Sequence, residues 1–329
     1  MKLLVTGGLG FIGSNFILKL LKHEDIEITN IDAELYGSDH RNLAQIKNSD
    51  RYNFVKGNIS NKKLMEEQIS SCDAVVNFAA ESHVDRSIND ANPFLVSNIR
   101  GAFTILDIIT KQKKRMVHIS TDEVFGSLSN GTADEKSKFN PSSPYAATKA
   151  AAELLINSYS ITYNSDVVIT RCTNNFGPRQ FTEKLIPKII ILANKNLKIP
   201  IYGEGKNIRD WIFVDNHCDA VEMALFNGKS GESYNISADN EIDNITIVKK
   251  ILEIMNKSED LIEFVEDRPG HDFRYSMSSK KIANELKWKI TTNFEKGLEK
   301  TVEWYLANPE ILNNISQTVL NPTPWKNNQ

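Results

Sequence analysis

Three side chains with exchangeable protons stand together in the middle of the chain: Thr121, Asp122 and Glu123. They follow the apolar run at 116–119, which predicts a buried strand that ends at Ser120. Parallel sheets place their ligands at the carboxyl ends of strands. We therefore expect these three groups to line a site.

Tyr145 and Lys149 provide a second set of groups that exchange protons. Their spacing of four residues puts a phenol and an ammonium on one face of a helix. The ammonium and a nearby pyridinium ring would both favour the phenolate, so the pKa of Tyr145 is expected to fall. Tyr145 could then take a proton from an alcohol as hydride leaves the same carbon, with Thr121 hydrogen-bonded to the same oxygen.

Asp122 and Glu123 are more than such an oxidation needs. Two carboxyls suit a second task, in which one removes a carbon-bound proton and the other donates a proton so that water leaves. Close packing of two carboxyls tends to split their pKa values in that way. The alternative interpretation is a solvated turn, which two adjacent acids commonly form.

The N-terminal segment predicts a dinucleotide site. A strand at 2–5 is followed by the glycine-rich run at 7–13, a helix at 11–21, and a strand at 26–31 that ends on Asp32. Gly7 permits a tight turn, Gly10 lets backbone N–H groups approach a pyrophosphate, and Gly13 lets the helix pack on the sheet. Asp32 would accept ribose hydroxyls and repel a 2′-phosphate, which favours NAD over NADP.

Strands and helices alternate as far as residue 173, with strands expected at 52–55, 74–78 and 166–171 and helices at 93–111 and 144–163. This alternation predicts a Rossmann-type doubly wound parallel sheet. Beyond it we expect loops at 174–178 and 203–209, short strands at 199–202 and 211–214, and helices at 216–226 and 246–256. The prediction is an NAD-binding domain at 1–173 that carries the catalytic residues. A smaller α/β substrate-binding lobe at 174–329 packs intimately on it, with some chain crossing back.

Composition narrows the function class. The chain has 329 residues, of which 40% are hydrophobic and 25% charged, and a net charge of -3 gives no reason to expect nucleic acid or an anionic membrane. Cys72, Cys172 and Cys218 are far apart, and no CxxC or HExxH spacing occurs, which argues against disulfides and metal. The N-terminus lacks a signal-peptide pattern and no apolar run reaches membrane length. A cytoplasmic protein is expected.

The run Ser-Thr-Asp-Glu-Val-Phe-Gly at 120–126 closely resembles that of the dTDP-glucose 4,6-dehydratases, which are extended short-chain dehydrogenase/reductases with a tightly held NAD. Stretches similar to other motifs of the family extend the resemblance from residue 1 to about 306. They lie at 6–14, 79–88, 170–178, 183–187, 208–211, 234–236 and 267–275.

The resemblance implies a redox-neutral dehydration of dTDP-glucose to dTDP-4-keto-6-deoxyglucose. Tyr145 would deprotonate the 4-hydroxyl as the C4 hydride passes to NAD, with Lys149 holding both the tyrosine and the nicotinamide ribose. The new ketone acidifies the C5 proton, which Glu123 would abstract while Asp122 protonates the departing 6-hydroxyl. The hydride then returns to C6 and a proton returns to C5.

The resemblance also implies two sets of binding residues. For the cofactor these are Gly7, Gly10, Phe11, Ile12, Gly13, Asp32, Asn58, Ile59, Ala80, Ser97, Tyr145, Lys149 and Asn175. For the substrate they are Ser82, Thr121, Asn174, Lys184, Leu185, Arg209, Asn235, Arg268 and His271. Lys184, Arg209 and Arg268 would supply the cations that a nucleotide diphosphate requires.

The family further suggests a homodimer through the helices at 93–111 and 144–163. Apolar residues on them are compatible with an interface, although a stripe that faces the sheet would look the same. These residues are Phe94, Phe103, Ile105, Leu106, Leu154, Leu155 and Ile156.

Several alternatives stay open. Asn58 stands where the family usually has Asp, and the segment at 34–41 differs from the family pattern, so a UDP-, CDP- or GDP-linked sugar remains a possible substrate. A sugar-nucleotide C4 epimerase or a uronic acid decarboxylase would share the fold and the Tyr145–Lys149 pair, but neither needs both acids. The non-enzyme alternative is an NAD-binding scaffold or redox sensor.

Overall fold

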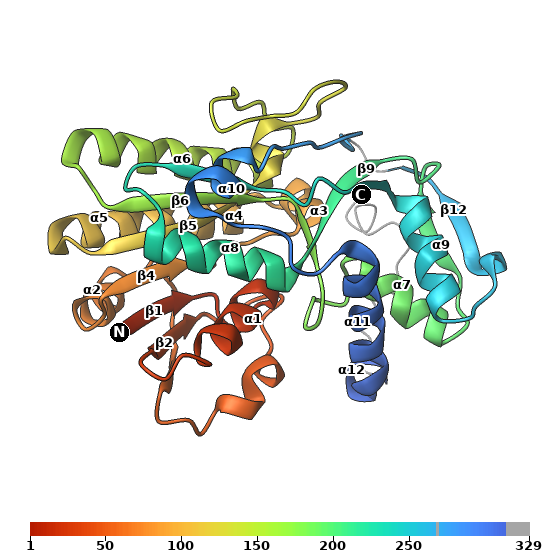
Figure 1. Cartoon of the computed structure of the whole chain (residues 1–329), viewed down its shortest axis with the longest axis horizontal. Coiled ribbons are helices and arrows are strands. Elements are labelled where there is room, and N and C mark those ends of the chain that lie inside the picture. Colours follow the sequence, from red (N-terminus) through yellow and green to blue (C-terminus); the bar gives the residue numbers. More distant parts are fainter. Residues whose placement is uncertain (268–269, 314–329) are drawn as a thin grey trace.

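A seven-stranded parallel sheet forms the centre of the computed structural model, which describes residues 1–267 and 270–313. The strand order is β10-β6-β5-β4-β1-β2-β3, with the change of direction between β1 and β4 (Figure 1). A doubly wound sheet with this order binds its ligand at that change of direction. The strands are β1 (Lys2–Thr6), β2 (Glu27–Asp32), β3 (Tyr52–Lys56), β4 (Ala74–Asn77), β5 (Arg115–Thr121), β6 (Val167–Cys172) and β10 (Ser233–Ile236).

Helices cover both faces of the sheet, as a doubly wound fold requires (Figure 1). One face carries α1 (Phe11–Leu20), α8 (Val214–Asn227) and α10 (Lys280–Leu286) over an apolar layer that includes Val5, Phe16 and Val117. The other carries α2 (Lys62–Ser70), α5 (Ala102–Gln112) and α6 (Pro144–Tyr163) over a layer that includes Leu4 and Met116. The predicted fold class is confirmed.

The helix expected at 93–111 is present but is not a regular α-helix. It consists of α4 (Asn92–Phe94), a π-helical segment η2 (Leu95–Gly101) and α5, in direct succession. π-Helical segments are rare and frequently occur at functional sites. The helix expected at 144–163 has the predicted bounds, because Ser143 caps it by accepting a hydrogen bond from the Ala146 N–H and Pro144 occupies the first turn.

The two long helices divide their apolar residues between the core and the surface. Four of the seven residues named for an interface are buried within the protomer, namely Phe94, Ile105, Leu106 and Ile156. Phe103 and Leu154 are exposed, whereas Leu155 packs against the core in part. The buried members form the stripe that faces the sheet.

The C-terminal lobe has its own apolar core, which includes Phe176, Ile190, Trp211 and Val248. Its strands are β7 (Asn174–Phe176), β8 (Ile199–Tyr202), β9 (Ile208–Phe213), β11 (Glu241–Asp243) and β12 (Ile262–Val265). Its helices are α7 (Leu185–Asn194), α9 (Asn244–Ile254), α11 (Phe294–Ala307) and α12 (Pro309–Asn313). Figure 1 shows this lobe at one end of the large sheet.

Two predictions in this lobe were wrong. The expected loop at 174–178 contains β7, which pairs in parallel with the later part of β9. The expected loop at 203–209 contains the start of β9, which pairs with β11 in the antiparallel direction. Their polar residues give no alternating pattern, so the pairing partner decides the conformation.

The chain returns from this lobe to the large sheet, because α8 packs on α1 and β10 pairs with β6.

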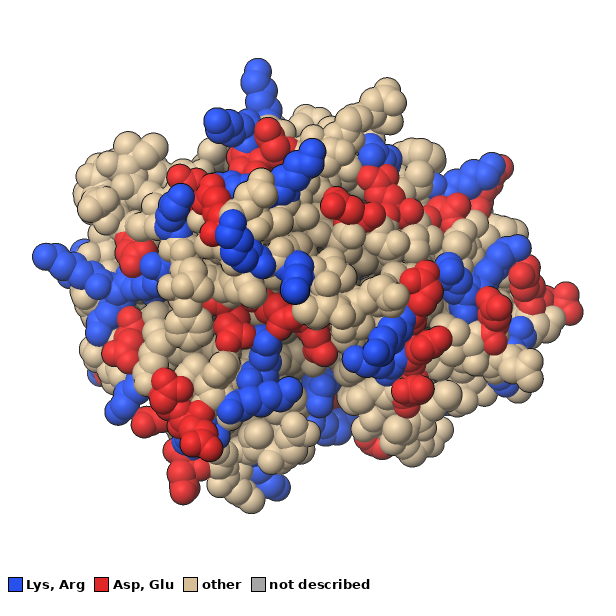
Figure 2. Space-filling view, in the orientation of Figure 1, with Lys and Arg blue, Asp and Glu red and all other residues tan. Residues whose placement is uncertain are grey.

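Short helical segments connect the main elements: η1 (His40–Ile46), α3 (Val84–Asn89), η3 (Asp122–Phe125) and η4 (Glu259–Leu261). Within the residues that the structure describes, no helix is long and apolar enough to cross a membrane, and no cluster of potential metal ligands occurs. Figure 2 shows acidic and basic side chains interspersed over one face of the molecule.

Candidate active site

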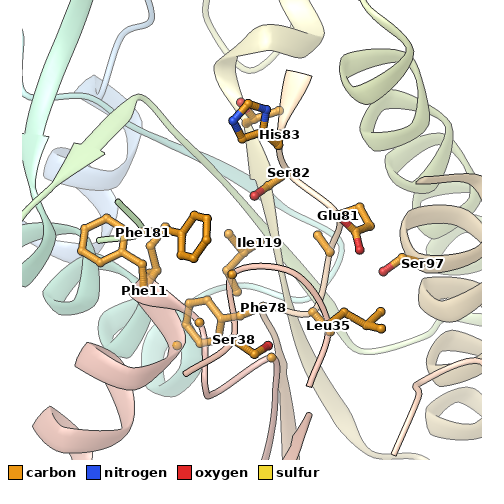
Figure 3. A pocket seen from close by; sticks show the side chains of 18 of the residues that line it. Phe11, Leu35, Ser38, Phe78, Glu81, Ser82, His83, Ser97, Ile119 and Phe181 are labelled. Carbon is orange, nitrogen blue, oxygen red and sulfur yellow. The ribbon is translucent and has the colours of Figure 1, made fainter. Parts of the chain in front are cut away.

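A cavity of about 320 Å³ runs along the carboxyl ends of the strands at the change of direction in the sheet. The ends of β2, β5 and β6 line it, together with the segments that follow β1, β2, β3, β4, β5 and β6. Figure 3 shows Phe11 and Phe181 on one side of the cavity and Glu81 and Ser97 on the other. The cavity is therefore placed where a doubly wound sheet binds a dinucleotide.

The glycine turn shapes one end of this cavity. Gly7 has a φ of +71°, and a Cβ there would lie 2.7 Å from the backbone of Ala79. A Cβ on Gly13 would lie 2.5 Å from the Gly7 carbonyl oxygen. Helix α1 begins at Phe11 without a side-chain cap, because its N-cap residue is Gly10. The N–H groups of its first turn thus lie at the cavity with the positive end of the helix dipole.

Asp32 is held at the end of β2 by three hydrogen bonds. One carboxylate oxygen accepts from the Leu9 N–H at 3.0 Å, and the other accepts from the Glu34 N–H at 2.9 Å and the Ser38 hydroxyl at 2.7 Å. The side chain is buried and still lines the cavity. Its orientation is therefore fixed before any ligand arrives.

The predicted proton-transfer groups meet at the other end of the cavity. Strand β5 ends at Thr121, whose hydroxyl accepts from the Glu123 N–H at 3.3 Å and donates to the Asp122 carboxylate at 3.2 Å. This capping turns the chain into η3, which brings both acids to the cavity beside Tyr145 and Lys149 of α6. All five side chains line the same cavity.

The expected fall in the pKa of Tyr145 does not occur in the protein alone. Burial raises the pKa well above the ordinary 10.0, the negative charge of Glu123 adds to the rise, and a hydrogen bond with Thr121 opposes it. The loss of solvent around the phenol outweighs the effect expected from the charge of Lys149. The Lys149 ammonium donates to the Ile119 carbonyl at 2.6 Å, and burial lowers its own pKa to about 8.

Asp122 has the properties of a proton donor at neutral pH. Burial raises its pKa from 3.8 to about 8, and the neighbouring charge of Glu123 adds to the rise. One of its carboxyl oxygens, Oδ2, is buried and has no hydrogen-bond partner among residues 1–267 and 270–313. The raised pKa of Asp122 favours its protonated form at pH 7, and the division of tasks between the two carboxyls stays a prediction.

A second cavity of about 210 Å³ adjoins the first and extends into the C-terminal lobe. The two share four lining residues, namely His83, Glu123, Asn174 and Lys184. Glu123 therefore lies at the junction between the glycine-turn cavity and the C-terminal lobe.

Arg209 is a buried cation that lines the second cavity. It donates to the backbone carbonyls of Ile208, Asp272 and Phe273, and its guanidinium lies 4.4 Å from the ring centroid of Tyr275. His271, on the same cavity, lies 2.6 Å from the Asp267 carboxylate. The second cavity thus carries Lys184, Lys188, Arg209 and His271 as basic groups, together with the acids Asp85, Glu123 and Glu183.

Known proteins resemble this chain over most of its length. The family model described as GDP-mannose 4,6 dehydratase matches residues 4–301. A dTDP-glucose 4,6-dehydratase of Streptomyces niveus is 43% identical over 314 residues, which cover 94% of each chain. The low-salt glycan biosynthesis protein Agl12 of Haloferax volcanii is 45% identical over 311 residues, 94% of this chain and 100% of that protein. The chain belongs to the dTDP-glucose 4,6-dehydratase family.

A solved structure supports this assignment. DesIV of Streptomyces venezuelae, a dTDP-glucose 4,6-dehydratase crystallised with NAD and TYD bound, superposes with a TM-score of 0.92. The two are 40% identical, and the match covers 94% of this chain and 98% of DesIV. The resemblance to the dTDP-glucose 4,6-dehydratases that the sequence motifs indicated is confirmed.

The structure brings nearly all the predicted binding residues of this dehydratase to the two cavities. The first is lined by all thirteen residues named for the cofactor and by Ser82, Thr121, Asn174 and Lys184. The second is lined by Asn174, Lys184, Leu185, Arg209 and His271. Asn235 lines neither, because it is fully buried behind the site with its side-chain oxygen on Arg171. Arg268 lies outside the described residues.

Sequence reasoning missed residues that hold the dehydratase site together. Asn98, in the π-helical segment, accepts from the Glu81 N–H at 2.9 Å, donates to the Glu81 carbonyl at 3.0 Å and donates to the Thr148 hydroxyl at 2.9 Å. Ser87 accepts from the Tyr145 N–H at 3.2 Å. Asn98 thus joins the cavity wall to α6, and no local pattern in the sequence indicates that role.

Proposed function

We propose that the protein dehydrates dTDP-glucose to dTDP-4-keto-6-deoxyglucose. One observation carries the proposal: Asp122 and Glu123 line the same cavity as Thr121, Tyr145 and Lys149. An epimerase or a simple dehydrogenase needs the latter three groups only. A solvated turn would leave Asp122 in water, whereas its side chain is 4% exposed.

NAD fits the first cavity. The uncapped first turn of α1 offers N–H groups to the pyrophosphate, and the fixed carboxylate of Asp32 would accept ribose hydroxyls. When bound, NAD supplies reversible hydride transfer, taking the hydride from C4 of the sugar and returning it at C6. Asn58, Ile59, Ala80, Ser97 and Asn175 complete the proposed cofactor site along the same cavity.

For the oxidation, we assign the base to Tyr145. Its phenol takes the proton of the 4-hydroxyl, and Thr121 hydrogen-bonds the same oxygen. Because burial holds the pKa of Tyr145 above its ordinary value, the phenolate requires a positive charge close by. Lys149 supplies one such charge from one helical turn further along α6.

For the elimination, we assign the base to Glu123 and the acid to Asp122. Glu123 removes the C5 proton after the C4 ketone has formed, from its place at the junction of the two cavities. Asp122 donates its proton to the departing 6-hydroxyl, since a pKa of about 8 keeps it protonated at pH 7. Water leaves across C5–C6.

The nucleotide diphosphate is assigned to the second cavity. Lys184, Arg209 and His271 bring basic groups to it, and Ser82, Asn174 and Leu185 complete the proposed sugar and nucleotide contacts. The names of the relatives favour dTDP as the carrier. Arg268 and Asn235 stay predictions as substrate ligands.

The deciding experiment is a panel of dTDP-, UDP-, CDP- and GDP-glucose with the purified protein, after its NAD content has been measured. We expect a 4-keto-6-deoxy product from dTDP-glucose without added reductant, identified by mass and NMR. Deuterium at substrate C4 should appear at C6 of the product, whereas an epimerase returns it to C4. Bound NAD with no product from any of the four sugars would refute the proposal.

We also propose a homodimer through α5 and α6. The side chains of Phe103, Leu154 and Ile161 are 40%, 60% and 86% exposed, and all three belong to these two helices. Leu154→Asp should convert the dimer to a monomer in analytical ultracentrifugation, whereas Leu197→Asp, on the C-terminal lobe, should not. A wild-type monomer at micromolar concentration would contradict the assembly.

Two further assignments accompany this function. We place the protein in the cytoplasm, since Cys72, Cys172 and Cys218 are all buried free thiols, which suits a reducing compartment. We assign NAD binding and catalysis to residues 1–173 and mainly substrate binding to 174–329.

A further inference from the structure

A buried ion pair lies directly behind the proposed catalytic groups. Arg171 of β6 and Glu153 of α6 have side chains that are 3% and 0% exposed. The guanidinium Nε donates to both carboxylate oxygens at 3.1 and 2.9 Å, and a terminal nitrogen donates to one of them at 2.7 Å. Burying such a pair costs desolvation that apolar residues of similar volume would not incur, so stability alone is a weak reason for it.

Arg171 contacts the element that carries the two proposed elimination residues. It pairs in register with Ser120, the residue before Thr121. Its guanidinium lies 5.2 Å from the ring centroid of Phe125, which ends η3, and 5.4 Å from that of Phe139. The guanidinium thus lies within cation–π range of the residue that ends η3.

Glu153 connects the same guanidinium to the oxidation residues. It follows Lys149 by four residues on α6, so both side chains lie on the face that packs against β5 and β6. A third bond steadies the arrangement, because Arg171 also donates to the Asn235 side-chain oxygen at 3.2 Å. One guanidinium therefore contacts both η3, which carries the elimination residues, and α6, which carries the oxidation residues.

The pair also sets the charge around Lys149. The groups that act electrostatically on or with Lys149 are Glu153 from α6, His118 from β5 and Cys172 from β6, and Tyr145 lies one turn before it on α6. Arg171 of β6 binds the same Glu153 carboxylate, and Asp122 of η3 acts on Cys172. Burial lowers the pKa of Lys149, and the carboxylate of Glu153 is the largest effect that opposes it. If Glu153 were removed, Arg171 and Lys149 would both remain buried and would both lack this carboxylate.

We propose that Glu153 and Arg171 are positioning residues for the dehydration: the ion pair between them holds η3, with its two acids, in place against α6, which carries Tyr145 and Lys149. The inference rests on the proposed function. Neither side chain lines the cavities, so both act through the groups that do.

The test compares Glu153→Gln, Glu153→Asp and wild type by kcat and KM for dTDP-glucose from pH 6 to 10, with NAD content and Tm measured in parallel. We expect Glu153→Gln to lose kcat about tenfold or more with KM within about twofold. Because Lys149 then loses its proton at lower pH, the alkaline limb of the rate constant for C4 oxidation should move down by about one pH unit. This step is measured apart from the elimination, which depends on the proton of Asp122. Glu153→Asp restores the charge and should return that limb toward its wild-type position.

A control separates positioning from stability. Glu222 forms a 3.0 Å ion pair with Lys19 between α8 and α1, away from the cavities. Glu222→Gln should lower Tm without moving the pH profile. A folded, NAD-containing Glu153→Gln variant with wild-type kcat and pH profile would overturn the inference, provided that the wild type makes product. Absence of product from the wild type would instead refute the proposed function.

A second pair of variants decides the matter if Glu153→Gln does not fold. Phe125 and Phe139 pack on the same guanidinium at similar distances, but only Phe125 belongs to η3. Phe125→Leu should lower kcat at least fivefold more than Phe139→Leu, at a comparable loss of Tm. Equal losses of kcat in the two variants would overturn the inference.

Discussion

Asp122→Asn should stabilise the folded protein at neutral pH while it abolishes dehydration. The wild-type carboxyl has a pKa raised from 3.8 to about 8 by burial and by Glu123. The folded state therefore retains a proton that the unfolded chain has lost at pH 7. Each pH unit above the unfolded pKa costs the folded state about 1.4 kcal/mol, so the cost reaches about 4 kcal/mol at pH 7.

The amide of the variant does not titrate, so it carries no such cost. One of its polar atoms would occupy the position of Oδ2, which has no hydrogen-bond partner in the part of the chain that the structure describes. An unpartnered buried amide costs about 1–3 kcal/mol. The net gain at pH 7 is therefore about 1–3 kcal/mol. Since the folded pKa is raised, wild-type stability falls as pH rises from about 4 to about 8, and the advantage of the variant grows over that window.

Urea unfolding at pH 5 and pH 7, at one fixed NAD concentration, measures this advantage. The difference in unfolding free energy between Asp122→Asn and wild type should increase by about 3 kcal/mol between the two pH values. Asp134→Asn is the control, because hydrogen bonding of its exposed carboxyl lowers the pKa and both states are ionised throughout. A difference for Asp122→Asn that does not change with pH would refute the reasoning.

Three further predictions concern activity and cofactor binding. Asp122→Asn and Glu123→Gln should each lower the rate of product formation at least about 100-fold. Their NAD content, measured by absorbance after denaturation, should stay near that of the wild type. Loss of NAD would show that the acids are structural. Dehydration should decline as pH rises through about 8, where Asp122 loses its proton, and a rate constant for elimination that stays flat to pH 10 would contradict this assignment. Gly13→Ala puts a Cβ 2.5 Å from the Gly7 carbonyl oxygen, so it should lose most of its NAD and lower Tm. Gly131→Ala is the control, because it strains a backbone φ of +76° but lines neither cavity, so it should retain NAD.

The features that sequence predicted well depend on neighbours in the chain. The glycine turn, α1 and Asp32 follow one another within a single strand-helix-strand unit, so composition and spacing define them. Thr121, Asp122 and Glu123 follow an apolar run, and the end of that run marks the edge of the sheet. Tyr145 and Lys149 share a helix face because helical periodicity places them there.

The features that it missed depend on contacts between distant segments. The pKa of Tyr145 is governed by burial and by Glu123, and a sequence shows neither the loss of solvent nor the direction of a side chain. Asn98 acts through Glu81 and Thr148, which belong to other elements. Asn235 belongs to a family motif, but its side-chain oxygen accepts a hydrogen bond from Arg171 and the residue lines neither cavity. The motif alone did not indicate this buried position.

The return of the chain to the large sheet has a consequence for folding during synthesis. Strand β6, which carries Arg171, has β5 on one side and β10 on the other, and β10 emerges from the ribosome only after β7, β8, β9 and α8 have been made. Until then, one edge of β6 is open and can pair with another chain. Domains fold as units as the chain is synthesised. Here, however, the unit that includes the catalytic residues is complete only after much of the substrate lobe has been translated, so a truncated product that ends near residue 173 should aggregate.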